Sequence, residues 1–235
     1  MRNFLGNILG GMLKFIYDLV SNIGTEPDKF SYYAMAIIIA TIIFKLLILP
    51  LNLQQIKSTK KMNEIQPEMK KIQNKYKNDP QTMQIKMQEL YKKYNYNPMS
   101  GCLPLLIQFP ILFAFLAVFR EPAKYAFTDP AFYQAMNKAF LWIPNLEHPD
   151  TILWGLPLLA ALTTYLQSKA ITPANADPQT QSTQKMMSYF FPIMIFFTAR
   201  SFPAGLALYW VISNLFTAVQ YSISNRSTGK IKEEK

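Results

Sequence analysis

Residues 31–53 read SYYAMAIIIATIIFKLLILPLNL, an apolar run whose single charge is Lys45. About 20 such residues are enough to cross the hydrocarbon layer of a bilayer as a helix. Four further windows contain no Asp, Glu, Lys or Arg: residues 101–119, 151–168, 186–199 and 201–225. A soluble helical protein would show a polar stripe along each helix, and these windows mostly lack one. The sequence therefore predicts an all-α, polytopic membrane protein with five transmembrane helices.

Composition excludes most familiar enzyme chemistries. The 235 residues include one cysteine, Cys102, and one histidine, His148. A single cysteine forbids an internal disulfide and a multi-thiolate zinc site, and a single histidine forbids a His-pair metal site. The eight glycines form neither a Walker loop nor a dinucleotide fingerprint. We therefore expect no catalytic residues, no metal and no cofactor, and predict that the protein is not an enzyme.

The charges between the apolar windows predict the orientation. Sixteen Lys and Arg residues fall on the side of residues 54–100, 167–185 and the C-terminal tail, against seven on the other side. Because cytoplasmic loops are enriched in Lys and Arg, we expect a multi-pass membrane protein with its N-terminus outside and its C-terminus in the cytoplasm.

Ten segments are expected along the chain. They are an outer interfacial amphipathic helix (1–30), a first span (31–53), a cytoplasmic helical hairpin (54–100), a second span (101–119), an outer loop (120–150), a third span (151–168), a cytoplasmic loop (169–184), a fourth span (185–200), a fifth span (203–222) and a cytoplasmic tail (223–235). For residues 1–30, an uncleaved, atypical signal sequence is the alternative.

The hairpin is predicted from two helical patterns on either side of Asn78-Asp79-Pro80. Apolar residues recur every three or four positions: Met62, Ile65, Met69, Ile72 and Tyr76, then Met83, Met87, Leu90 and Tyr94. The lysines have two interpretations, a solvated face near anionic lipid or a docking surface for a partner such as ribosomal RNA. Those expected to contact a partner are Lys57, Lys60, Lys61, Lys70 and Lys71.

Polar residues inside the apolar windows mark the candidate site. Lys45 lies near the middle of the first span, where an insertion penalty of about 2.5–3.5 kcal/mol applies. Uncharged polar residues accompany it: Thr41, Gln108, Thr164 and Gln167, and a face of the fifth span formed by Trp210, Ser213, Asn214 and Thr217. Each uncharged residue alone is typical of hydrogen bonding between helices. Together with Lys45 they predict the lining of one hydrated groove.

No Asp or Glu occurs inside any expected span, so an incoming carboxylate is the natural partner of Lys45. A proton-coupled transporter would normally need an intramembrane carboxylate or histidine. An intramembrane protease would need Ser with His, or paired Asp, within the spans. A binding surface for transient peptide clients needs none of these groups. The predicted client-binding groove consists of Lys45, Thr41, Gln108, Thr164, Gln167, Trp210, Ser213 and Asn214.

Four stretches add a resemblance. They are KSTKKM (57–62), QPEMK (66–70), NPMSGCLPLLIQ (97–108) and FPAGLALYW (202–210), in this order along the chain. From about Tyr32 to Asn225 the sequence resembles the YidC family of membrane protein insertases. The resemblance implies a five-helix core around a positively charged, water-filled groove and a flexible cytoplasmic hairpin. It also implies a location in the bacterial plasma membrane and the insertion of small membrane proteins, alone or beside the Sec translocon.

The resemblance extends to single positions. Lys45 occupies the place where the family usually has a groove arginine, and Gln167 and Trp210 match groove positions of shorter bacterial members. The implied partners are nascent membrane proteins with short, often acidic, translocated segments, the SecYEG translocon, the ribosome, the signal recognition particle receptor and anionic lipids. We predict a membrane protein insertase and chaperone. A small-solute transporter or channel using the same cavity, and a structural assembly factor, are the alternatives.

Overall fold

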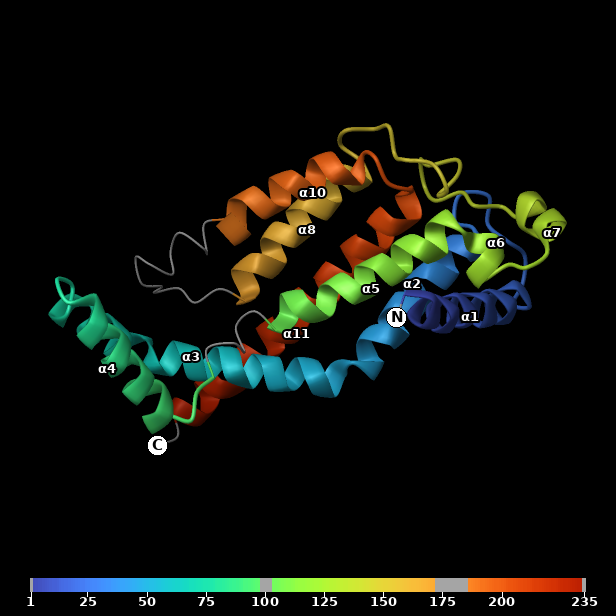
Figure 1. Cartoon of the computed structure of the whole chain (residues 1–235). Coiled ribbons are helices and arrows are strands. Elements are labelled where there is room, and N and C mark those ends of the chain that lie inside the picture. The colour runs from blue at the N-terminus through green and yellow to red at the C-terminus, as the bar shows by residue number, and fades with distance from the viewer. Residues whose placement is uncertain (1, 98–102, 172–185, 234–235) are drawn as a thin grey trace.

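The computed structural model describes residues 2–97, 103–171 and 186–233, and within them the chain folds into helices joined by loops (Figure 1). The helices are α1 (Arg2–Ser21), α2 (Tyr32–Leu47), α3 (Leu49–Lys75), α4 (Pro80–Lys93), α5 (Leu103–Arg120), α6 (Pro122–Tyr125), α7 (Pro130–Ala135), α8 (Leu156–Ile171), the π-helix η2 (Met186–Phe190), α10 (Phe191–Ala199) and α11 (Ala204–Glu233). Parts of several expected segments lie outside the described residues: 98–100, 101–102 with Cys102, 172–184, 185 and 234–235.

Helix α11 is the centre of the bundle, since it packs against α2, α5, α8 and α10. Its first turns are buried through Leu206, Leu208 and Tyr209. The Tyr209 ring stacks on Phe115 of α5 with ring centroids 3.9 Å apart. Helix α1 covers α2 and α5 from outside, and its buried face includes Leu13. The central position of α11 places its polar face between the other helices.

The expected first span, residues 31–53, is a bent pair of helices. Helix α2 begins at Ser31, whose side chain accepts a hydrogen bond from the Ala34 N–H, and it ends at Leu47. Helix α3 starts at Leu49 and departs at 61°. Pro50 is tolerated in the first turn of α3 but would break a helix interior, which explains the bend at this point.

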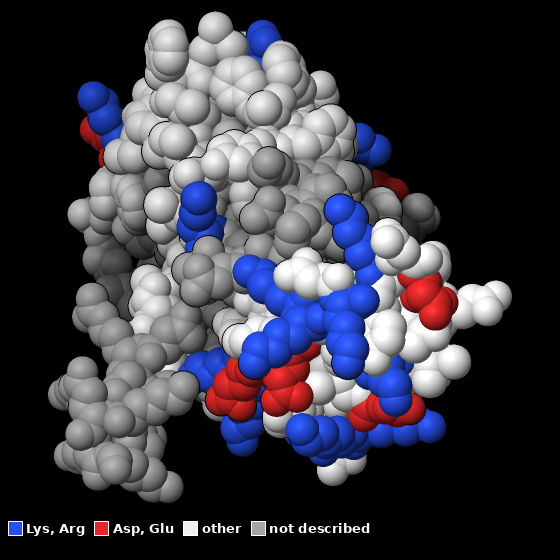
Figure 2. All heavy atoms as spheres, turned by 90° about the vertical axis from the view of Figure 1, so that its left-hand side faces the viewer, with Lys and Arg blue, Asp and Glu red and all other residues white. Residues whose placement is uncertain are grey.

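Helices α3 and α4 form the hairpin. Asp79 caps α4 by accepting a hydrogen bond from the Thr82 N–H, and Pro80 occupies the first position of α4. The buried seam consists of Ile65, Met69, Leu90 and Tyr96, with Met62, Ile72, Met87, Tyr91 and Tyr94 packed against it. Figure 2 looks at this end of the molecule and shows lysines gathered over the hairpin. We call this the hairpin end.

The opposite end carries α6, α7 and the loop between α7 and α8, and we call it the loop end (Figure 1). Here Lys138 is buried, and its ammonium lies 3.1 Å from a carboxylate oxygen of Glu147. The loop also holds the start of α11, because the carbonyls of Leu146 and His148 accept hydrogen bonds from the N–H groups of Gly205 and Ala204. These bonds fix the turn between α10 and α11.

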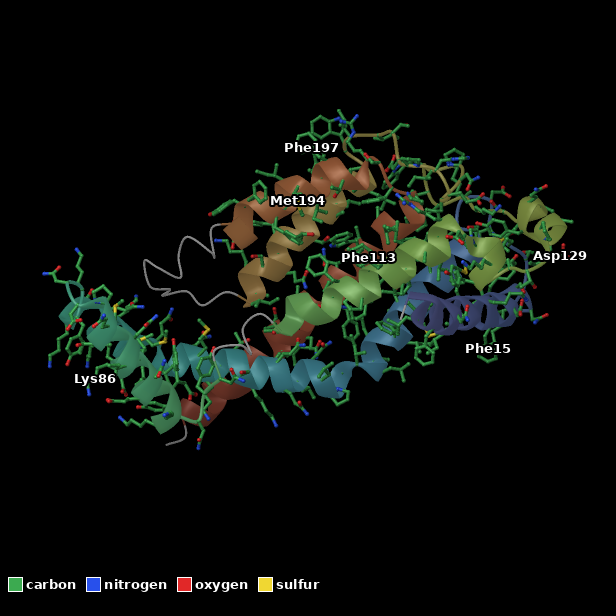
Figure 3. All side chains as sticks on the ribbon, viewed as in Figure 1. Phe15, Lys86, Phe113, Asp129, Met194 and Phe197 are labelled. Atoms are coloured by element: carbon green, nitrogen blue, oxygen red, sulfur yellow. The ribbon has the colours of Figure 1, made fainter. Side chains whose placement is uncertain are left out.

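Length and composition identify membrane spans only in part. Among the described residues, Phe4–Ser21 and Ala204–Ser224 are each long and apolar enough to cross a bilayer, and the bent pair α2–α3 is a third candidate. Gln108–Arg120 and Ser188–Ala199 are apolar but shorter. Exposed apolar side chains cover opposite sides of the molecule, for example Phe15 on α1 and Phe197 on α10 (Figure 3). In the described residues the fold is therefore helical, with two or three helices or helix pairs that are long and apolar enough to cross a membrane.

Candidate functional site

A cavity of about 140 Å³ lies between α2, α3, α5, α8 and α11. This volume is enough for several water molecules. Its polar lining comes from Lys45, Asn52, Gln55, Gln108, Thr164, Gln167, Ser168, Trp210, Asn214, Thr217 and Tyr221. Its apolar lining comes from Ile48, Phe109, Ile111, Leu112, Ile171 and Phe191. The lining of the cavity is therefore mixed, because amides, hydroxyls and a cation share it with aliphatic and aromatic groups.

Lys45 contributes the charge of the cavity from the last turn of α2. It is only 5% exposed, and its ammonium donates a hydrogen bond to the hydroxyl of Thr217 at 3.2 Å. That hydroxyl donates in turn to the Ser213 carbonyl at 2.9 Å, so its lone pair faces the ammonium. Among the described residues, neither the lining nor the ion pairs give Lys45 a carboxylate partner.

Asn214 joins α11 to α8 at the wall of the cavity. Its amide orientation follows from its neighbours: the NH₂ group donates to the Gln167 side-chain oxygen at 2.6 Å, and the oxygen accepts from the Trp210 indole N–H at 3.3 Å. The Thr164 hydroxyl lies 2.8 Å from the same amide. Four predicted groove residues therefore form one hydrogen-bonded cluster across the contact between α8 and α11. They are Thr164, Gln167, Trp210 and Asn214.

The remaining predicted groove residues are placed differently. Gln108 lines the cavity and donates to the Tyr209 hydroxyl at 3.3 Å. Thr41 is buried one turn before Lys45, where its hydroxyl donates to the Ile37 carbonyl at 2.6 Å, and it is not among the lining residues. Ser213 is also buried outside the lining, and its carbonyl accepts the hydrogen bond of the Thr217 hydroxyl. The structure thus brings six of the eight residues to one cavity.

Sequence reasoning missed four polar lining residues, Asn52, Gln55, Ser168 and Tyr221, and it placed Thr217 on the polar face of the fifth span without including it in the client-binding set. Thr217 and Tyr221 continue the α11 face by one and two turns, and the helical spacing from Trp210 was the signal for Thr217. Asn52 and Gln55 come from the start of α3, which lines the cavity because of the bend after α2. Ser168 follows Gln167 and pairs with Ser188 at 2.9 Å.

The five hairpin lysines do not form a uniform surface. Lys57 and Lys71 are exposed. Lys60 donates to the Ser224 carbonyl of α11 at 2.6 Å, and Lys61 donates to the Asn95 carbonyl at 3.1 Å. Lys70 is partly buried. Of the five lysines, two are therefore exposed, two hold α3 against neighbouring segments, and Lys70 is partly buried without belonging to either group.

The described residues offer little other chemistry. No group of three His, Cys, Asp or Glu side chains among them could hold a metal ion. His148 contributes through its backbone carbonyl at the start of α11. The arrangement provides one buried cation, an amide cluster and an apolar wall, which suit reversible binding of a chain segment with polar and apolar parts.

Comparison with known proteins identifies the family. Residues 27–232 match the family described as 60Kd inner membrane protein. The chain is 38% identical over 222 residues to a membrane protein insertase YidC of Clostridium tetani, covering 94% of each chain. It is 41% identical over 203 residues to the one of Oceanobacillus iheyensis, covering 83% of this chain and 75% of that one. It is 38% identical over 240 residues to the membrane protein insertase YidC of Clostridium acetobutylicum, covering 100% of this chain and 88% of that one. The chain therefore belongs to the YidC membrane protein insertase family, a family of insertases and not of enzymes.

Proposed function

We propose that this chain inserts small membrane proteins by drawing a short polar segment of the client into the cavity beside Lys45. The observation that carries the proposal is a buried ammonium in an amide-lined cavity, with no carboxylate among the described lining residues. A client carboxylate would supply the missing partner in a charge-assisted hydrogen bond. Family membership favours insertion over the solute-channel alternative for the same cavity.

Each wall of the cavity has a role in this proposal. Lys45 attracts acidic client residues, and the amides of Gln108, Gln167 and Asn214 replace hydrogen bonds that the client loses with water. The apolar wall, including Phe109 and Phe191, accepts the apolar part of the client. The client helix then leaves into lipid, a step driven by removing apolar surface from water, so no nucleotide is needed.

The membrane arrangement that we propose has five spans. They are α2 with the first turn of α3, then α5, α8, the segment 186–200, and α11 as far as residue 222, with α1 lying in the outer interface. The apolar windows support the spans, and the excess of Lys and Arg supports a cytoplasmic hairpin end. For α1, the Lys14–Asp18 ion pair at 2.6 Å supports an interfacial position, although Phe4–Ser21 is long enough to span.

At the hairpin end we propose that Lys57, Lys60, Lys61, Lys70 and Lys71 contact partners. Charge attraction suits anionic lipid headgroups, at about 1 kcal/mol for each lysine near the surface. The ribosome, the SecYEG translocon and the signal recognition particle receptor are further proposed partners. Lys57 and Lys71 are the most accessible of the five.

The test is insertion of two clients into liposomes that contain the purified protein. The clients differ only in their translocated tail, acidic in one and neutral in the other. We expect Lys45→Glu to reduce insertion of the acidic-tailed client by about tenfold or more, because like charges repel in the cavity. Insertion by Lys45→Ala should lie between that of the wild type and that of Lys45→Glu, and Lys45→Arg should retain insertion activity. Full insertion of the acidic-tailed client by the Glu variant would falsify the charge-attraction step.

A further inference from the structure

The loop between α7 and α8 exposes a group of large apolar side chains. They are Leu141, Trp142, Ile152, Leu153 and Trp154, and we call them the loop patch. Trp154 is 78% exposed and the others are 41–48% exposed. Apolar patches of this kind usually mark a surface that contacts a membrane or a protein. The loop patch takes no part in the cavity beside Lys45.

A buried carboxylate holds the two parts of the loop patch together. Asp150 is 4% exposed and accepts hydrogen bonds from the Trp142 indole N–H at 3.0 Å, the Ile152 N–H at 3.0 Å and the Leu156 N–H at 2.8 Å. Gly155 lies against it, because a Cβ at this position would come within 2.1 Å of the Asp150 carboxylate. The patch is therefore mounted on a close-packed base at the start of α8.

The same loop is joined to α11. The Leu146 carbonyl accepts from the Gly205 N–H at 2.8 Å, and the His148 carbonyl accepts from the Ala204 N–H at 2.9 Å. Helix α11 in turn carries Thr217, which binds the Lys45 ammonium. Thr217 lies 13 residues after Ala204, or about 20 Å along a helix. Whatever fixes the depth of the loop patch also fixes the depth of the cavity.

The surroundings of the patch identify its partner as lipid. The apolar surface continues along α8 through exposed Leu159, Leu162 and Leu166. In Figure 3, Phe197 projects from α10 on the same side of the molecule as this loop. Two indoles next to aliphatic side chains are typical of the boundary between headgroups and acyl chains. Asp150, the carboxylate beneath the patch, is buried and hydrogen-bonded, so insertion of the patch would not expose this charge to lipid.

We propose that the loop patch inserts into the bilayer interface at the loop end and sets the depth of α11. Lys45 is then held about 20 Å from that interface, past the middle of a hydrocarbon layer about 30 Å thick. A thinner bilayer brings Lys45 closer to the opposite surface, so the best bilayer thickness for client insertion depends on the patch. The thickness effect rests on the proposed function, whereas the position of the patch does not.

The position is tested with tryptophan fluorescence, because the chain has three tryptophans, Trp142, Trp154 and Trp210. The variant Trp210→Phe removes the tryptophan outside the patch and keeps the Trp142–Asp150 hydrogen bond, so the emission in liposomes comes from the patch indoles Trp142 and Trp154. We expect lipids brominated near the headgroup to quench this emission by about half or more, and aqueous iodide to quench it weakly, as for interfacial indoles. Strong iodide quenching without bromine quenching would overturn the proposal. Protection from both quenchers would also overturn it, since a protein would then cover the patch.

The thickness effect is tested with Trp154→Asp and its apolar control Trp154→Phe in liposomes of increasing acyl-chain length. We expect the Asp variant to shift the optimum for client insertion and the Phe variant to keep the wild-type optimum. An unchanged optimum in the Asp variant, with bromine quenching of the patch indoles intact in the Trp210→Phe variant, would overturn the depth-setting role alone. Loss of the Lys45 charge effect would instead contradict the proposed function and leave the quenching result standing.

Discussion

Two lysines are almost completely buried in the part of the chain that the structure describes, and their surroundings differ. Lys138, at the loop end, is 6% exposed and lies 3.1 Å from Glu147. It also donates to the Tyr133 carbonyl at 2.6 Å and stands 4.0 Å from the centre of the Tyr133 ring. Lys45, in the cavity, is 5% exposed and has the hydroxyl of Thr217 as its hydrogen-bond acceptor among the described side chains.

The comparison separates a structural cation from an available one. A buried charge is strongly unfavourable unless it is paired and hydrogen-bonded. Lys138 meets this requirement with a carboxylate, a carbonyl and an aromatic face, so its pairing holds the loop together. Lys45 has a neutral acceptor and an adjacent cavity, so its charge remains available to a ligand. Burial alone therefore does not mark a site, whereas burial without an anionic partner does.

The sharpest way to break the comparison is to give Lys45 a carboxylate of its own. In Thr217→Asp the carboxylate would lie where the hydroxyl now accepts from Lys45 at 3.2 Å. We expect insertion of an acidic-tailed client to fall about tenfold, because each factor of ten corresponds to about 1.4 kcal/mol of lost attraction. Thr217→Asn, which is neutral and of the same size as Asp, is the control. Equal insertion by the Asp and Asn variants would show that the Lys45 charge is not used.

The converse change removes the partner of Lys138. We expect Glu147→Gln to lower the free energy of unfolding by about 1–2 kcal/mol, less than for a fully buried pair, because the Glu147 side chain keeps 29% exposure. Thermal unfolding in detergent measures the change. Adding Lys138→Met should restore part of the loss, since no unpaired charge then remains buried. Glu121→Gln, in the exposed pair with Lys124, should leave stability unchanged.

The smallest effect on stability is expected from substitutions in the hairpin, because the charged side chains there are exposed to solvent. The Tyr94 hydroxyl donates to the Glu68 carboxylate, and this hydrogen bond, followed by the Lys93 charge, lowers the pKa of Glu68 from 4.5. The contact therefore contributes to hairpin stability above pH 4.5 and loses its contribution as the pH falls through the lowered pKa. In carbon-13 NMR titrations, Tyr94→Phe should raise the pKa of Glu68. Lys86→Ala, which affects the pair with Glu89, should not.

The sequence predicted the helices well where a single pattern, either uniform apolar composition or helical spacing, decides the local structure. Uniform apolar composition located α5, α8, α10 and the first half of α11, and the spacing of Ile65, Met69 and Leu90 identified the residues that pack in the hairpin. The expected third span is helical only from Leu156, because residues 151–155 form the loop capped by Asp150. The tail beyond residue 222 continues α11 as far as Glu233.

The candidate site was predictable on the helices but not at their junction. Lys45, Gln167 and Asn214 stand out because polar groups are rare in apolar windows. Asn52 and Gln55 follow the bend at Ile48, and no local sequence pattern reveals the direction in which the chain bends just before Pro50. The Lys138–Glu147 pair was equally hidden, because its members are joined across a loop without periodicity.

The bend at Ile48 means that a small change in the tilt of α3 produces a large displacement at its far end. Its 27 residues extend about 40 Å, with Asn52 and Gln55 near the bend, in the cavity wall, and the hairpin turn at the far end. A tilt of about 10° at the bend displaces the far end by about 7 Å on this length. The same tilt moves Asn52 and Gln55 by only about 1–2 Å, so a small displacement in the cavity wall is enlarged several-fold at the hairpin turn.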